Sequence, residues 1–270
     1  KEKVVTACTD RLVECLSKGW TIDAEEIVSF MKEQGIIEEK ITELFNSEVN
    51  YKEKIVTACK DGLVKYLSNG WDDEVRRIVS FMKEQGIIKE KIVEVLKPKE
   101  IRDMVTARKD GLVICLSNGL TNDAKSIVSF MEAQGIIKEK IPEVFNPKEM
   151  KQIVTACKDG VVKCLSDSWI GAAKRIVSFM KEQGIIKEKI VEVLKTKEIR
   201  DIVTACKDTL VEYLSYGRTG YAKEIVFFMK EQGINEEEII KKLEIIKVLM
   251  QNLNCKSIED LFEYDCEFLS

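Results

Sequence analysis

Residues 55–71 read Ile-Val-Thr-Ala-Cys-Lys-Asp-Gly-Leu-Val-Lys-Tyr-Leu-Ser-Asn-Gly-Trp, and this stretch decides the fold. Its apolar residues Val56, Cys59, Leu63 and Leu67 stand at i, i+3, i+7 and i+11, the spacing of one face of an α-helix. The glycine after Ser-Asn is suited to a left-handed helix cap. The stretch therefore predicts an amphipathic helix of about five turns that ends in a tight turn.

The same stretch recurs along the chain. Val-Thr-Ala-Cys starts at Val5, Val56, Val154 and Val203, with Val-Thr-Ala-Arg at Val105, so the spacings are 51, 49, 49 and 49 residues. Two further anchors keep this register, Phe-Met at Phe30, Phe81, Phe130, Phe179 and Phe228, and Gln-Gly-Ile at Gln34, Gln85, Gln134, Gln183 and Gln232. A fixed period of this length is the signature of a repeat protein.

Each copy is predicted to hold two longer helices and a short third one. Pro98 and Pro147 mark the start of the first helix in two copies, because proline suits the first helical position. In the second copy the second helix ends at Gly86, and a short third segment covers residues 88–96. In the third copy, Pro142 requires the third helix to start late.

None of these helices can bury its apolar face alone, so the copies must stack. We expect an all-α, right-handed α-solenoid of five three-helix repeats, at 1–51, 52–101, 102–150, 151–199 and 200–246, with capping helices at 247–270. Asn235 with Glu238 predicts the start of a long helix through Asn254, and Ser257 with Asp260 predicts a final helix ending near Leu269. The period and helix count resemble armadillo and HEAT repeats in architecture only, and the consensus matches no specific family.

The copies differ mainly in one place. Residues 55–103 and 153–201 differ at ten positions, and seven of these lie in an eight-residue window, 69–76 against 167–174. We name the five equivalent segments 18–25, 69–76, 118–125, 167–174 and 216–223 the variable windows. A constant scaffold with one varied connection per repeat is typical of a modular recognition surface. The alternative is that these loops have simply drifted, although the Gln-Gly-Ile connection has not.

The variable windows supply the candidate binding residues. Trp20, Trp71 and Trp169 occupy one position, with Leu120 and Arg218 in the other two copies, and could anchor a partner, stack on bases, or cover the first helix of the next repeat. The full set of predicted partner-binding residues is Trp20, Asp23, Trp71, Asp72, Asp73, Arg76, Leu120, Asn122, Lys125, Trp169, Ile170, Lys174, Tyr216, Arg218 and Tyr221.

Composition limits the chemistry that the chain can perform. It has no histidine among 270 residues, which excludes Ser-His-Asp and Cys-His catalysis and histidine-ligated zinc. No glycine motif for nucleotide binding occurs, and the net charge is −4, so we expect no enzyme, no catalytic residues, no metal and no small-molecule cofactor. No apolar run approaches the ~20 residues that span a membrane, so no membrane partner is expected.

The nine cysteines lie mostly on the first helices. Equivalent positions about 10 Å apart are too distant for disulfides, and no Cys-x-x-Cys occurs, so we expect reduced, metal-free thiols and an intracellular, cytoplasmic location. Arg108 interrupts the row of Cys8, Cys59, Cys157 and Cys206. Either this row is partly exposed, which we favour, or Arg108 meets a carboxylate. The invariant Asp10, Asp61, Asp110, Asp159 and Asp208 are expected to pair locally or cap.

These features favour a binding scaffold for a protein or peptide. The alternative is a nucleic-acid reader, because Ser-Asn-Gly at Ser68 and Ser117, between two helices with varied residues at the turn, resembles transcription activator-like effector repeats. Basic residues at the start of the second helices, including Arg76, Lys125 and Lys174, keep this alternative open.

Overall fold

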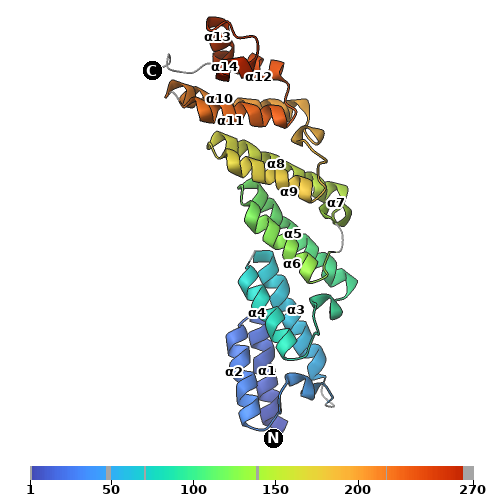
Figure 1. Cartoon of the computed structure of the whole chain (residues 1–270). Helices are drawn as coiled ribbons and strands as arrows, with labels where there is room; N and C mark the ends of the chain where they lie inside the picture. The colour runs from blue at the N-terminus through green and yellow to red at the C-terminus, as the bar shows by residue number, and fades with distance from the viewer. Residues whose placement is uncertain (1, 47–49, 70, 138–139, 217, 264–270) are drawn as a thin grey trace. The chain divides into compact units, whose positions relative to one another are not determined.

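The two longer helices expected in each copy are present in the computed structural model of the chain (Figure 1). The structure describes residues 2–46, 50–69, 71–137, 140–216 and 218–263. In this part of the chain there are fourteen α-helices, three 3₁₀ helices and no strand. The prediction of an all-α fold with regularly spaced helix pairs is therefore confirmed.

Each repeat begins with a long helix and continues with a shorter one. The first helices are α1 (Glu2–Lys18), α3 (Tyr51–Asn69), α5 (Pro98–Ser117), α8 (Pro147–Ser166) and α10 (Thr196–Ser215). The second helices are α2 (Thr21–Glu33), α4 (Asp72–Glu84), α6 (Thr121–Ala133), α9 (Ile170–Glu182) and α11 (Thr219–Glu231). From the second copy on, each first helix begins one to four residues before the predicted repeat boundary, so those boundaries lie in its first turns.

The third segment is smaller than predicted. It is a 3₁₀ turn in three copies, η1 (Ile41–Asn46), η2 (Ile92–Glu94) and η3 (Ile190–Glu192), and one α-helical turn in the third copy, α7 (Ile141–Val144). A glutamate in the turn holds it together: the Glu94 carboxylate accepts the backbone N–H groups of Lys89, Glu90 and Lys91 at 2.7–2.8 Å. These backbone N–H groups donate to a side-chain carboxylate instead of making the backbone hydrogen bonds of a longer third helix.

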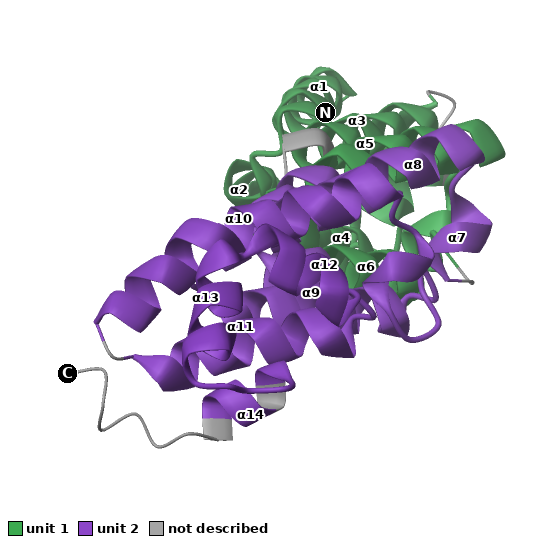
Figure 2. Ribbon diagram, turned by 90° about the horizontal axis from the view of Figure 1, so that it is seen from above, with its two compact units in different colours: residues 1–111, 126–138 green, residues 112–125, 139–270 purple. Residues whose placement is uncertain are grey.

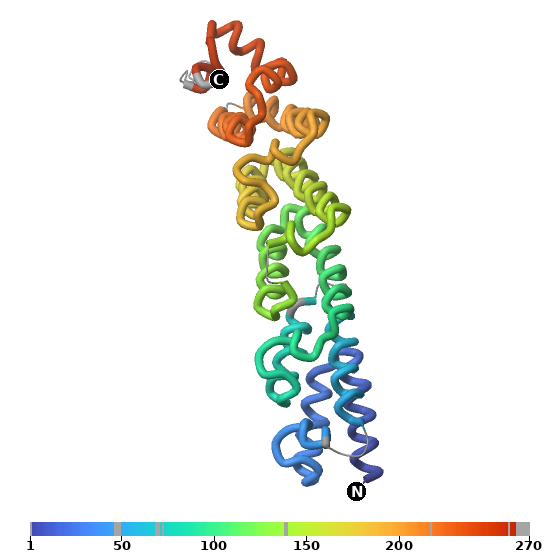
Figure 3. Tube along the Cα trace, turned by 90° about the vertical axis from the view of Figure 1, so that its right-hand side faces the viewer, coloured from blue at the N-terminus to red at the C-terminus, as the bar shows by residue number. Residues whose placement is uncertain are grey.

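The chain forms two compact units, coloured separately in Figure 2, residues 1–111 with 126–138 and residues 112–125 with 139–270. In the first unit α1 packs against α2 and α3, and α2 packs against α4. In the second unit α8 packs against α9 and α10, and α9 packs against α11. Within each unit, first helices therefore pack on first helices and second helices on second helices, as the trace in Figure 3 shows for α1–α4 and for α8–α11.

Consecutive first helices approach each other at a small residue. A Cβ added to Gly62 would lie 2.4 Å from the backbone oxygen of Leu16, and one on Gly160 would lie 2.0 Å from that of Leu116. The residue equivalent to Leu16 is Leu67, five positions after Gly62, so neighbouring first helices are staggered by about 7 Å along their axes. Within a unit, the variable windows of neighbouring repeats are therefore displaced from one another along the helix axes.

The C-terminal helices cover the fifth repeat, but the predicted long helix is broken. Asn235 does begin a helix, because its side chain accepts the N–H of Glu237 at 2.8 Å. That helix, α12 (Glu236–Lys242), stops at Leu243, and α13 (Glu244–Asn252) follows. Leu243 is fully buried, and the break lets its side chain enter the core.

The last predicted helix also exists, as α14 (Ile258–Glu263). Ser257 and Asp260 cap it reciprocally, since the Ser257 hydroxyl accepts the Asp260 N–H at 3.1 Å and the Asp260 carboxylate accepts the Ser257 N–H at 3.0 Å. Its predicted end near Leu269 lies outside the described residues. None of the helices in the described part of the chain is long and apolar enough to cross a membrane.

Candidate functional site

The backbone of each variable window is held by a helix-terminating turn. In the first copy the Gly19 N–H donates to the Leu16 oxygen at 3.0 Å and the Trp20 N–H donates to the Cys15 oxygen at 2.8 Å. This is a Schellman motif, and it needs a left-handed residue, which Gly19 provides with φ of +76°. The residue at the tryptophan position makes the same bond in the other copies, as Trp71, Leu120, Trp169 and Arg218. The turn thus determines this residue's place through its backbone and leaves its side chain free to vary.

The exposed apolar side chains concentrate in the windows. Twelve large hydrophobic side chains are exposed in the described part of the chain, and seven lie in the windows: Trp20, Ile22, Trp71, Leu120, Trp169, Tyr216 and Tyr221. Their exposed fractions run from 43 to 71%. Each window therefore exposes at least one large apolar side chain, on a fold whose other large apolar side chains are mostly buried in the part that the structure describes.

The described tryptophan contacts come from the same repeat. The Trp71 ring stacks on Tyr66, the last aromatic of its own first helix, with centroids 5.4 Å apart. The Lys18 ammonium lies 4.6 Å from the centre of the Trp20 ring. In the fifth copy the tryptophan is absent, and Tyr221 stacks on Tyr213 at 5.2 Å instead. Trp20, Trp71 and Tyr221 nevertheless remain 43–54% exposed.

The polar candidates are less uniform. Asp73, Arg76, Asn122, Lys174 and Arg218 are exposed, whereas Asp23 and Lys125 are half-buried. The Lys125 ammonium pairs with the Glu182 carboxylate of the next repeat at 2.8 Å. The Ile170 side chain is only 4% exposed and belongs to the core, and the Asp72 side chain lies outside the described residues.

Two exposed residues beside the candidates escaped the sequence prediction. Ile22 lies in the first window and is 59% exposed, and Ile114 lies in the last turns of α5 and is 61% exposed. Ile114 is equivalent to Lys65 and Lys163, whose ammonium groups donate to Lys18 and Asn118 of the preceding repeat. The other repeats carry a charged residue at this position, and the isoleucine in the third repeat was the sequence signal that could have identified Ile114.

Charge divides the windows into different types. Lys174, Arg175 and Arg218 are exposed and have no carboxylate within 4.0 Å in the described part of the chain. The first window instead carries Asp23 and Glu25 and is followed by Glu26. The fourth and fifth windows therefore offer unpaired cations close in sequence to exposed aromatic residues, and the first window offers carboxylates.

The constancy of Gln-Gly-Ile has a structural cause. The glycines form a second Schellman turn, with Gly86 at φ of +70° and the Ile87 N–H donating to the Met82 oxygen at 2.8 Å. The buried Gln85 side chain accepts the Ile41 N–H of the preceding repeat at 3.3 Å. Gln134 and Gln232 make the equivalent bonds to Ile92 and Ile190 at 3.4 Å. The Gln-Gly-Ile connection is therefore constant because its structure constrains it. Its constancy does not show whether the variable windows differ by drift or by selection for binding.

The cysteine row is buried at Cys59, Cys157 and Cys206, so our expectation that the row is partly exposed holds only at Cys8. Cys59, Cys157 and Cys206 are fully buried thiols, and burial raises the pKa of each to about 12. Arg108 is also buried, at 1% exposed, with its guanidinium carbon 5.4 Å from the centre of the Phe130 ring. The long apolar stem of arginine fills the space, and the ring face receives the charge.

The acidic side chains and thiols of the described residues form no metal-binding cluster. No group of three or more cysteine, aspartate or glutamate side chains among them is placed to hold a metal ion. The invariant aspartates face solvent, where Asp110 and Asp159 pair with the adjacent Lys109 and Lys158 at 3.2 Å. Eight cysteines are described as thiols, and Cys266 lies outside the described residues.

Comparison of the chain with protein-family models, with curated proteins and with solved structures finds no match.

Proposed function

We propose that this chain is a non-enzymatic binding scaffold, a right-handed α-solenoid that recognises a protein or peptide through its variable windows. The observation that carries the proposal is the concentration of exposed apolar side chains in the windows, seven of twelve in the described part of the chain. Exposed aromatic residues on a rigid support are typical of protein-binding hot spots. The buried, protonated thiols support a reducing, intracellular location.

Nucleic acid is the second candidate ligand. It is favoured by Lys174, Arg175 and Arg218, which lie beside exposed aromatic rings without a carboxylate partner. Cations and stacking rings together suit a single strand. The acidic first window and the net charge of −4 favour a protein or peptide.

The test begins with a random peptide display library selected on the full chain. Selected peptides are then titrated by calorimetry against Trp71→Ala, Trp169→Ala and Val248→Ala. Val248 is a matched control because it is an exposed apolar residue outside the windows. We expect each tryptophan variant to lose about 2 kcal/mol or more of binding free energy, and the control to lose less than about 0.5 kcal/mol.

Thermal unfolding separates a binding role from a packing role. Because both tryptophans are more than half exposed, their variants should melt close to the parent chain. Selected peptides that bind both tryptophan variants as tightly as the parent would refute the windows as the site. A labelled oligothymidylate that binds instead, with affinity falling steeply as salt rises, would favour the nucleic-acid alternative.

A further inference from the structure

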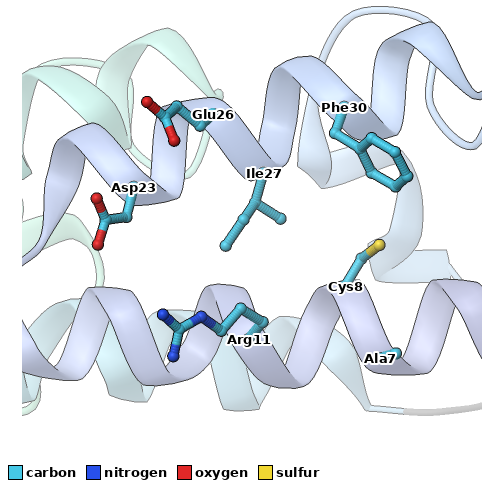
Figure 4. A pocket seen from close by; sticks show the side chains of 7 residues that line it. All are labelled: Ala7, Cys8, Arg11, Asp23, Glu26, Ile27 and Phe30. Atoms are coloured by element: carbon cyan, nitrogen blue, oxygen red, sulfur yellow. The ribbon is translucent and has the colours of Figure 1, made fainter.

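The first repeat carries an open cleft between its two helices. Its volume is about 580 Å³, and Ala7, Cys8, Arg11, Asp23, Glu26, Ile27 and Phe30 line it. Figure 4 shows Arg11, Asp23 and Glu26 toward one end of the cleft, and Phe30 and Cys8 together at the other. Every lining residue belongs to α1 or α2, within one unit.

This face is the one that later repeats bury. Phe30 is 44% exposed, whereas the equivalent Phe81, Phe179 and Phe228 are at most 1% exposed. Val4 is 46% exposed, and the equivalent Ile55 is fully buried where α3 packs on α1. The cleft therefore continues the surface through which one repeat contacts another, and it is apolar enough to bind a helical partner.

Another copy of the repeat fits this face poorly. Arg11 occupies the position of Gly62, Gly111, Gly160 and Thr209, and the preceding repeat's backbone comes close at each of these except Gly111. A Cβ on Gly62 would already lie 2.4 Å from a carbonyl oxygen, and Thr209 fits because its hydroxyl donates to the Ser166 oxygen at 2.9 Å. An arginine side chain there would block the regular stacking distance.

The face is, however, complementary to itself. A two-fold axis that runs parallel to the helices, between α1 and α2, lays α2 of one copy over α1 of the other. Because Arg11 lies at the same end of the cleft as Asp23 and Glu26, each copy's guanidinium then meets the other copy's carboxylates (Figure 4). The same rotation places Phe30 of one copy over Cys8 of the other.

We propose that two copies of this chain associate head to head through the cleft of the first repeat, with Arg11 of each copy pairing with Glu26 of the other. Arg11 now pairs with Glu14 on its own helix at 2.6 Å, an exposed contact of small net value that it can exchange. Two charge pairs and two phenylalanines close one symmetric interface. This inference does not rest on the proposed function of the windows, although Asp23 belongs both to the cleft and to the first window.

The experiment is sedimentation velocity of the full chain between about 1 and 100 µM. The parent chain should shift from its monomer mass of 30.9 kDa to twice that mass. Arg11→Glu and Glu26→Lys should each weaken the dimer by at least about tenfold, and the double variant should return to within about threefold of the parent. Glu26 is chosen over Asp23 because Asp23 also belongs to a variable window.

Glu25→Lys is the matched control, because Glu25 is exposed on the same helix but does not line the cleft. Phe30→Ser is a second variant that should abolish the dimer without altering charge. All variants are first checked for parental helicity and melting temperature. A parent chain that stays monomeric throughout the range overturns the proposal. So does a dimer that neither charge reversal nor Phe30→Ser weakens, because it would use another face.

Discussion

Arg108 shows how one residue can depart from the repeat without disturbing it. Three equivalent cysteines are buried thiols, and the arginine at their position is equally buried and lies against Phe130. The surrounding helices must therefore accommodate the larger arginine side chain. The other copies carry a small residue at this position, so we expect that the charge of Arg108 is not required there.

We predict that Arg108→Met keeps or raises stability, because methionine fills a similar volume without a buried charge. Arg108→Ala should lower the free energy of unfolding by about 2–4 kcal/mol, because it leaves a cavity. Chemical denaturation with circular dichroism measures both. If the methionine variant falls as far as the alanine variant, then the guanidinium itself stabilises the core.

At the scale of the element, the contact between first helices depends on the absence of a side chain. Gly160 lies against the Leu116 carbonyl, a backbone atom that cannot move aside cheaply. We predict that Gly160→Ala lowers the free energy of unfolding by about 1–3 kcal/mol. Gly171→Ala is the control, since Gly171 is exposed in the same repeat and only Arg175 lies within ordinary contact distance.

The control should be neutral or stabilising by up to about 1 kcal/mol, because alanine favours the helix. Urea denaturation measures the free energy of unfolding of both variants. Equal stabilities would mean that neighbouring first helices do not approach as closely at Gly160 as the structure places them.

The 3₁₀ turns should make stability depend on pH. Backbone N–H groups of Lys91, Lys89 and Glu90 lower the pKa of Glu94 to about 2, and the same kind of contacts lower the pKa of Glu43 and Glu192. A lowered pKa means that the folded state binds the proton more weakly than the unfolded state. The stabilisation from Glu94 is therefore complete above pH 4.5 and is lost as pH falls toward 2.

We expect Glu94→Gln to melt below the parent at pH 7, because an amide has one acceptor oxygen for three donors. The gap should narrow between pH 4.5 and pH 2, as the parent's carboxylate becomes protonated. Melting temperatures of the parent and of Glu94→Gln, taken across this pH range, measure the gap. Glu90→Gln removes a charge from the same turn without removing an acceptor, and it should give a constant gap. A constant gap for Glu94→Gln would contradict the capping role.

At the scale of the whole molecule, stability depends on neighbours rather than on a single core. The first, second and fourth repeats each donate a backbone hydrogen bond to the next repeat, at Gln85, Gln134 and Gln232, and α12 packs on α10 of the last repeat. Buried Ile239, Leu243 and Ile246 supply the covering surface.

We predict that a chain ending at Asn235 melts at lower temperature and self-associates, because an uncapped repeat exposes its apolar face. Differential scanning calorimetry and light scattering would measure the two effects. A truncated chain that melts like the parent and stays monodisperse would show that the C-terminal helices do not act as a cap.

Much of the architecture was readable from the sequence. Period, helix pairing and the two turn positions follow from local patterns, because glycine placement and apolar spacing act over a few residues. The place that we propose for the binding site also comes from the sequence, since repeat-to-repeat differences cluster in the windows, and it stays a prediction. The sequence does not predict what the windows bind, because variation among loops does not identify the chemistry of a partner.

Other features depend on tertiary contacts that no local pattern contains. Cys59, Cys157 and Cys206 are buried by helix packing, and so is Arg108, which lies against Phe130 of its own repeat. The third segment becomes a 3₁₀ turn because one glutamate satisfies three backbone donors at once, and α12 stops at Leu243 because that side chain enters the core. Ile170 is inside and Trp169 outside for the same reason: helix packing, not residue type, decides which side of a turn meets water.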